Sequence, residues 1–317
     1  MQSIVPPVDR QSLKRELTEE RFLRYTNNGN NHIYLVDYHI APNVMQEIGR
    51  LRELTFRGAG GGTGMPVDID ENDTCQNCYQ QLITWNPEDE EIVAGYRLIY
   101  CRNADIDQNG NINLSTAHLF QFSDKFKTDY LPFTIELGRS FVQPKYQPSI
   151  DNRKGLFSLD NLWDGLGAVV MLHPEVQYLF GKVTMYPHYN REARDLLLYF
   201  MNYYFPDREQ LVRPYPEITL SYETDPKVFE GTFDGMEYKE GYKVLNSKIR
   251  ALGENIPPLI NTYMNLSPTM KTFGTAHNDE FGAVEETGIL ITIADIYESK
   301  KQRHMETFTR DRVLGSR

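Results

Sequence analysis

The chain lacks any apolar run long enough to cross a membrane. Its longest apolar stretches, 196–205 and 288–296, reach about half of the roughly 20 residues that span a bilayer as a helix. The first ten residues include Pro6, Pro7 and Asp9 and contain no apolar signal core. We therefore expect a cytoplasmic protein whose membrane contact, if any, is peripheral and at the inner membrane face.

Cysteine and positive charge are also scarce. Three cysteines, an odd number, argue against a disulfide framework. Asp and Glu outnumber Lys and Arg by 44 to 33, which gives a net charge of −11. Because nucleic-acid binding requires a basic surface, this charge balance predicts no nucleic-acid partner.

No complete metal-binding motif is present. Cys75 and Cys78 have the spacing of half a zinc site, but no second pair of ligands accompanies them. The loop from Asp105 to Asn113 follows the first nine positions of a calcium-binding EF-hand loop, but Thr116 stands where that loop requires a bidentate Glu. The sequence therefore predicts no metal site.

Apolar residues recur along the chain at the spacings typical of strands and of helices. Alternating or continuous apolar residues predict strands at 32–39, 79–85, 92–100, 133–142, 177–185 and 288–296. Apolar residues at helical spacing predict helices at 18–25, 42–56, 158–172, 190–205, 237–252 and 257–266. This order predicts a mixed α/β fold, also describable as α+β, in which helices flank a central mixed sheet.

No linker divides the chain cleanly into domains. With 317 residues and 40% hydrophobic content, the chain can build one large core or two modest ones. We expect a peripheral N-terminal segment over 1–31 and a core domain over 32–223. The remaining residues, 224–317, are expected to form a C-terminal extension that packs on the core and completes the sheet.

One ordered set of charged and aromatic residues is more specific than the motifs above. Its members are Arg52, Phe56, Asp70, Asp73, Arg97, Glu136 and Arg139. Arg52 and Phe56 are four residues apart and share one face of a predicted helix. Taken alone, the charged members could form a solvated ion-pair network without any catalytic role.

The order and spacing of this set resemble the ornithine- and glycine-lipid N-acyltransferases, a family often labelled hemolysins. The set is also similar to that of the acyl-homoserine lactone synthases. Both families have the GNAT (GCN5-related N-acetyltransferase) fold and take acyl groups from acyl carrier protein. The aromatic residue that the synthases carry shortly after the Phe is missing, because 60–62 is a run of glycines. The resemblance covers roughly residues 34–295 and implies a GNAT-fold N-acyltransferase.

The resemblance also implies a reaction and roles for residues. A fatty acyl group, with or without a 3-hydroxyl, would pass from acyl carrier protein or acyl-coenzyme A to the amine of an amino acid, glycine or ornithine, with no permanently bound cofactor. Glu136 would hold or deprotonate the amine beside Arg139, and the planar guanidinium of Arg97 suits the acceptor's carboxylate. The remaining members would bind substrate and order the loop that closes the site: Arg52, Phe56, Asp70 and Asp73.

The donor side of the expected site follows the strand that carries Glu136. We expect Phe141 and Val142 to contact the donor, with backbone N–H groups near them stabilising the carbonyl oxygen. The turn at 152–157 matches the coenzyme A phosphate cradle of acetyltransferases only loosely. Lys145, Arg153 and Lys154 could instead form a basic patch for the acidic carrier protein, or an ordinary exposed loop.

Two further functions stay open at the level of sequence. One is an acetyl-coenzyme A dependent acetyltransferase of small amines. The other is a non-enzymatic protein, hemolysin-like or binding, although no amphipathic membrane-inserting segment is visible in the sequence.

Overall fold

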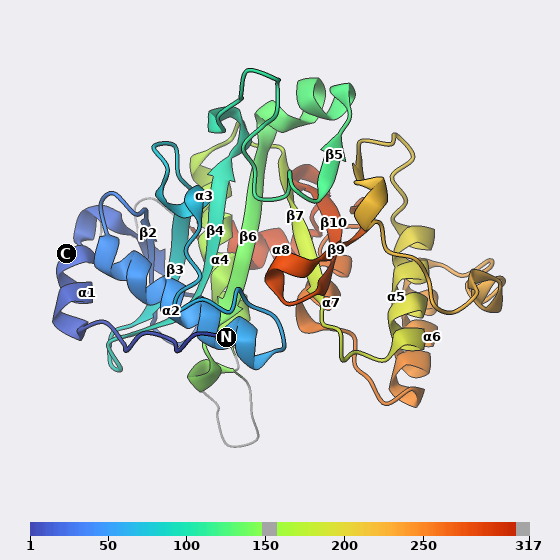
Figure 1. Cartoon of the computed structure of the whole chain (residues 1–317), viewed down its shortest axis with the longest axis horizontal. Coiled ribbons are helices and arrows are strands. Elements are labelled where there is room, and N and C mark those ends of the chain that lie inside the picture. Colours follow the sequence, from blue (N-terminus) through green and yellow to red (C-terminus); the bar gives the residue numbers. More distant parts are fainter. Residues whose placement is uncertain (148–156, 309–317) are drawn as a thin grey trace. The chain divides into compact units, whose positions relative to one another are not determined.

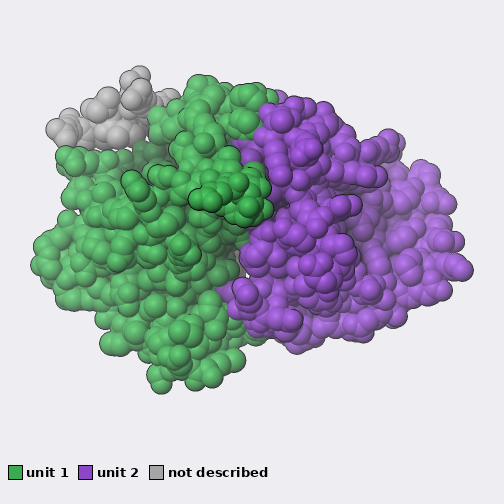
Figure 2. Space-filling view, turned by 45° about the horizontal axis from the view of Figure 1, so that its top comes forward, with its two compact units in different colours: residues 1–115, 132–177, 297–317 green, residues 116–131, 178–296 purple. Residues whose placement is uncertain are grey.

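The computed structural model describes residues 1–147 and 157–308. The chain forms two compact units, which Figure 2 colours separately. The first unit contains residues 1–115, 132–177 and 297–317, and the second contains 116–131 and 178–296. The domain boundaries expected at 31/32 and 223/224 stay a prediction.

The first unit is built on five antiparallel strands. They are β1 (Phe22–Tyr25), β2 (His32–Val36), β3 (Gln80–Asn86), β4 (Glu91–Tyr100) and β6 (Thr134–Val142), hydrogen-bonded in that order. Nearly all of β4 is buried, as a central strand covered on both faces requires.

Two long helices cover opposite faces of this sheet. Helix α2 (Pro42–Gly58) reaches Gln81 of β3 through Arg52, and α4 (Ser158–Leu172) packs its Gly165 against Leu82. Because neighbouring residues of a strand point to opposite faces, the two helices lie on opposite sides (Figure 1). The unit's other helices are α1 (Arg10–Glu16), α3 (Glu71–Thr74) and α8 (Glu298–His304).

The second unit contains three neighbouring antiparallel strands and an aromatic core. Strand β10 (Val284–Thr292) pairs with β7 (Tyr178–Met185) on one side and β9 (Lys271–Asn278) on the other. A short ribbon joins β5 (Phe120–Phe122) to β8 (Val212–Pro214). The helices are α5 (Arg191–Tyr204), α6 (Tyr238–Ala251) and α7 (Pro258–Met264). Phe126, Phe180 and Phe273 pack together in its core.

The structure confirms most of the expected elements and corrects one. The helix expected at 18–25 is wrong, because 22–25 is strand β1, which pairs with β2. Strand β9 was not expected at all. Within residues 1–147 and 157–308, no helix combines the length and the apolar character that crossing a bilayer requires.

Candidate active site

An ion-pair network, buried except at Asp70, joins α2, α3 and β4 of the first unit. Arg52 Nη1 lies 3.0 Å from Asp73 Oδ2, and Arg97 Nη1 lies 2.8 Å from Asp70 Oδ2 and 3.3 Å from Asp73 Oδ2. The side-chain amide of Gln81 donates to Asp73 Oδ1 at 3.0 Å and its oxygen accepts from Arg52. The structure thus brings four of the residues predicted from sequence into one network.

The spacing of the two aspartates has a local structural reason. Asp70 is the N-cap of α3 and accepts a hydrogen bond from the Asp73 N–H at 3.2 Å. Asp73 returns the contact by accepting from the Asp70 N–H, also at 3.2 Å. This reciprocal capping box holds both carboxylates toward the two arginines, so the Asp-x2-Asp motif sets the geometry of the network.

For Asp73 and Arg97, the attraction between opposite charges outweighs the cost of burying a charge. Burial raises the pKa of Asp73, but the Arg52 and Arg97 guanidinium groups lower it more, and the result lies well below the ordinary value. Burial lowers the pKa of Arg97, but Asp73 and Asp70 raise it more, and the result lies above the ordinary value. Asp73 and Arg97 therefore stay charged at neutral pH.

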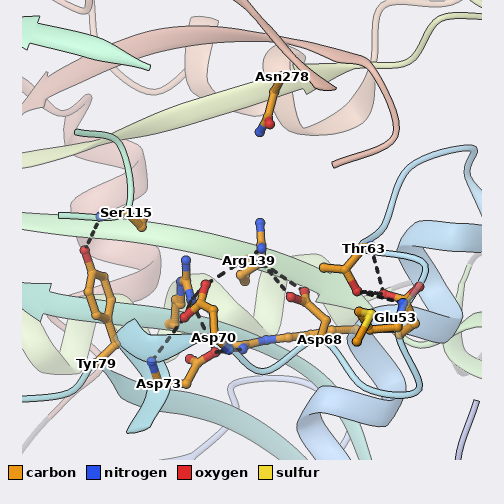
Figure 3. Close-up of polar contacts among 12 residues, drawn as sticks. Glu53, Thr63, Asp68, Asp70, Asp73, Tyr79, Ser115, Arg139 and Asn278 are labelled. Carbon is orange, nitrogen blue, oxygen red and sulfur yellow. Dashed lines mark hydrogen bonds and ion pairs between the residues drawn. The ribbon is translucent and has the colours of Figure 1, made fainter. Parts of the chain in front are cut away.

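Glu136 forms a second buried cluster on β6. Its side chain is fully buried, and its Oε2 accepts hydrogen bonds from the Tyr79 hydroxyl and, at 3.2 Å, from the Ser115 N–H. The Ser115 N–H also lies 2.9 Å from the Tyr79 hydroxyl (Figure 3). Burial, reinforced by the charge of Glu136, raises the pKa of Tyr79 well above its ordinary value, so the hydroxyl stays a donor.

A cation–π contact connects the two clusters. The Arg97 guanidinium carbon lies 5.0 Å from the centre of the Tyr79 ring. Arg97 therefore contacts Asp70 and Asp73 of the first cluster and Tyr79, which hydrogen-bonds Glu136, of the second. With only 2% of Arg97 exposed, its expected contact with an acceptor carboxylate stays a prediction, and Asp70 already occupies its guanidinium.

A β-bulge turns Arg139 toward the same network. Gly95 pairs with Phe141 and Arg97 pairs with Gly138, so two residues of β6, Arg139 and Ser140, lie opposite one residue of β4. Arg139 has a left-handed backbone, with φ of 49°. Strict alternation would point Gly138 and Arg139 to opposite faces, and the bulge is what allows both to face the network.

The side chain of Arg139 binds the acidic segment that precedes α3. Its Nε lies 2.9 Å from Asp68 Oδ2, and its Nη2 lies 3.9 Å from Asp70 Oδ2. Figure 3 shows Arg139 between these two carboxylates. Its side chain is 14% exposed, against 1% for Arg52 and 3% for Arg97, so Arg139 is the most accessible of these three arginines.

The glycine-rich loop after α2 is anchored by a residue that the sequence did not single out. The Glu53 carboxylate accepts from the Thr63 N–H at 3.0 Å, the Thr63 hydroxyl at 2.8 Å and the Gly64 N–H at 2.8 Å. Arg57 pairs with the same carboxylate at 2.7 Å. Glu53 thus orders the loop's end, a role expected of Arg52, Asp70 and Asp73.

The other predicted residues lie outside the charged network. Phe56 and Phe141 are buried core residues, and Phe141 packs where a Cβ on Gly95 would sit. Val142 is half-buried and pairs with Ala94. Lys145 is half-exposed, and its Nζ lies 2.9 Å from Glu91, so an acid already compensates its charge. The remaining two members of the expected basic patch, Arg153 and Lys154, fall outside the described residues.

The structure adds five residues to the cluster that sequence reasoning missed: Glu53, Asp68, Tyr79, Gln81 and Ser115. Glu53 and Arg57 at i and i+4 were a visible helical pair, and Asp68 belongs to an acidic run. Tyr79, Gln81 and Ser115 carried no signal in the sequence.

A pocket of about 420 Å³ opens on the other face of the sheet. Leu98 and Tyr100 line it and alternate along β4 with Arg97, and Asp37 and His173 also line it. None of the residues predicted for the site lines this pocket. In the described part of the chain, no group of three or more His, Cys, Asp or Glu side chains is placed to hold a metal ion.

Comparison with known proteins adds a functional context to this geometry. Residues 51–150, which contain most of the cluster, match the model of an acetyltransferase (GNAT) domain. The chain is 53% identical over 310 residues to a glycine N(alpha)-acyltransferase of Phocaeicola vulgatus, covering 98% of this chain and 94% of that protein. It is 56% identical over 308 residues to a glycine N(alpha)-acyltransferase of Bacteroides thetaiotaomicron, covering 97% and 91%. No solved structure matches the chain significantly.

Proposed function

Because the chain belongs to the family of GNAT N-acyltransferases that includes these two relatives, we propose that it acylates glycine, using a long-chain acyl thioester as donor. The observation that carries the choice of glycine is the 53–56% identity to two glycine N(alpha)-acyltransferases over at least 97% of the chain. The choice of donor, acyl carrier protein rather than acyl-coenzyme A, rests on the resemblance of the motif set. The product would be an N-acyl glycine, the lyso form of an amino-acid lipid.

The reaction needs one base and one oxyanion site. The glycine ammonium first loses a proton, and the free amine then attacks the thioester carbonyl carbon. The C–N bond forms, the C–S bond breaks, and the second amine proton ends on the carrier thiol. Direct attack fits this chain, because no pair of nucleophile and base was found in the sequence.

The proposed proton acceptor is Glu136, acting through Tyr79. The carboxylate and Tyr79 are both buried, and we propose that the amine proton enters this pair at the Tyr79 hydroxyl, which donates to the carboxylate. Tyr79 would pass its own proton to Glu136 and take one from the amine.

The proposed binding groups come from the bulge of β6. A bulge takes backbone N–H groups out of the regular ladder, and we assign to the stretch from Arg139 to Phe141 the donors that stabilise the carbonyl oxygen. Arg139 is more accessible than Arg97, so we assign to it the carboxylate of glycine, in place of Arg97. Arg52, Arg97 and the two aspartates of the capping box would then position α3 and the acidic segment before it, which Arg139 contacts through Asp68.

Activity of the purified protein tests the proposal. We expect N-acyl glycine, detected by mass spectrometry, when the chain is incubated with glycine and a 3-hydroxypalmitoyl carrier protein. Glu136→Gln should lower kcat by about 10²- to 10⁴-fold, the usual contribution of general acid–base catalysis, while the circular dichroism spectrum stays unchanged. Glu88→Gln, the same change at an exposed residue, is the matched control and should keep full activity.

Three outcomes would contradict parts of this account. Acetylation of amines from acetyl-coenzyme A, without acylation from the carrier, would replace the proposed donor. Full activity of folded Glu136→Gln would remove Glu136 from the chemistry. The absence of any acylated product with every donor and amine tested would overturn the proposed function.

A further inference from the structure

Helix α6 of the second unit carries an unusual concentration of positive charge for a chain of net charge −11. Its 14 residues include four cations and a single acid, Glu240. The cations are Lys239, Lys243, Lys248 and Arg250, and all are exposed. Within the described residues, no ion pair or side-chain hydrogen bond involves any of them.

Three of these cations form one stripe on the outward face of the helix. Gly241, Leu245 and Ile249 are the buried residues of α6, and Gly241 packs tightly against Tyr204 of α5. At about 100° per residue, Lys239, Lys243 and Arg250 fall within about 40° of one another, on the side opposite the buried residues. They span about 16 Å along the helix axis. Figure 1 shows α6 beside α5, on which its buried face rests.

Stability of the helix explains only part of this charge. Lys248 and Arg250 lie in the last turn, where cations favour the negative end of the helix dipole. Lys239 is the second residue of the first turn, where a cation is unfavourable. The stripe therefore costs the helix some stability at one end and calls for another explanation.

We propose that this stripe docks the protein on an anionic lipid surface. Protein interfaces are depleted in lysine at their core and are anchored by buried aromatic or aliphatic side chains. The stripe has no such anchor, because at helical spacing the polar Asn246 and Ser247 flank it on either side. Lysine is a mobile point charge, which suits many loosely placed phosphates better than one fixed carboxylate. A flat row of unpaired cations matches a planar anionic surface, whereas an acidic protein would need apolar contacts that the stripe lacks.

This inference goes beyond the proposed acyl transfer and does not depend on it. Each Lys or Arg near an anionic membrane strengthens binding by about fivefold, so the three residues together contribute on the order of a hundredfold. The attraction is screened by salt and falls off within about a Debye length of the surface.

Vesicle flotation tests the stripe directly. We expect the full chain to float with vesicles that contain phosphatidylglycerol, to stay behind with pure phosphatidylcholine, and to be released by high salt. The variant Lys239→Gln, Lys243→Gln, Arg250→Gln should bind anionic vesicles on the order of a hundredfold more weakly. The matched control Lys127→Gln, Arg208→Gln, Lys300→Gln changes the net charge equally, outside α6, and should bind like the wild type.

Acyl transfer with soluble substrates keeps the two proposals separate, since the α6 variant should match the wild type in that assay. Equal binding of the α6 variant and the wild type to anionic vesicles would overturn the inference. So would a wild type that ignores vesicles but binds an acidic carrier protein through α6, because the partner would then be a protein.

Discussion

At the residue scale, Asp73 is the centre of the charged network. Its carboxylate faces Arg52, Arg97 and Gln81, and it is completely buried. Buried ion pairs add little net stability when complete, but removing one partner leaves an uncompensated charge in the interior. Asp73 neutralises two buried guanidinium groups at once, so we regard it as the least replaceable acid of the site.

We predict that Asp73→Asn lowers the free energy of unfolding by about 3–5 kcal/mol at pH 7. The pKa of Asp73 is lower in the folded chain than its ordinary value near 4, so the folded state binds fewer protons. The carboxylate's stabilising effect is therefore complete above about pH 5, begins to fall near pH 4, and is lost as the pH falls through the folded-state pKa. Urea unfolding between pH 7 and pH 3 measures this difference.

The difference in free energy of unfolding between the wild type and Asp73→Asn should become smaller at acidic pH and stay constant above about pH 5. Asp124→Asn, at an exposed acid, is the control and should follow the wild type at every pH. An equal difference in unfolding free energy at pH 7 and pH 3 would contradict the role of Asp73 as the charge that compensates the two arginines.

At the element scale, close packing of glycines positions the helices of the first unit. A Cβ on Gly167 of α4 would lie 2.2 Å from the carbonyl oxygen of His304 at the end of α8. His304 also hydrogen-bonds Asp164 of α4 through Nδ1 at 2.8 Å. The C-terminal helix therefore docks on α4 at backbone distance, which only glycine permits.

Gly167→Ala should destabilise the chain by about 1–3 kcal/mol, the usual cost of overpacking, because backbone atoms must move apart. Thermal unfolding gives the magnitude, and faster amide exchange in α8 would locate the effect. Gly58→Ala at the end of α2 meets no atom within 4 Å and should be neutral or slightly stabilising. Equal effects of the two substitutions would contradict the packing argument.

The helices and strands also show which elements can be predicted from the sequence and which cannot. The expected helix 158–172 matches α4, and 42–56 falls inside α2, because both have strong helical periodicity and clear ends. Residues 22–25 were wrongly expected to be helical, since their strand exists through pairing with β2. Strand β9 has little apolar alternation and depends on its pairing with β10.

The residues of the candidate site were likewise predicted only in part from the sequence. The seven charged and aromatic members were found from a family pattern, and four of them, the two arginines and two aspartates, meet in one network. Tyr79 and Ser115 were missed because they reach Glu136 only through the tertiary fold. The bulge that turns Arg139 to the network depends on the register of β4 and β6, which periodicity does not reveal.

At the scale of the whole molecule, the excess of acidic residues and the proposed active site concern different partners of the protein. A net charge of −11 disfavours polyanionic partners unless a local basic surface intervenes, and α6 is such a surface among the described elements. The site itself carries buried, mutually compensated charges, with one arginine left partly accessible. A small zwitterionic acceptor suits that arrangement, because a single arginine suffices for its carboxylate.

The choice of glycine as acceptor is the central claim, and a competition assay tests it most directly. Equimolar glycine and ornithine would be offered together to the purified chain with one long-chain acyl carrier protein, and the two amides would be quantified by mass spectrometry. The account predicts that N-acyl glycine dominates the products. A predominance of N-acyl ornithine would contradict it and would assign the chain to the other acceptor.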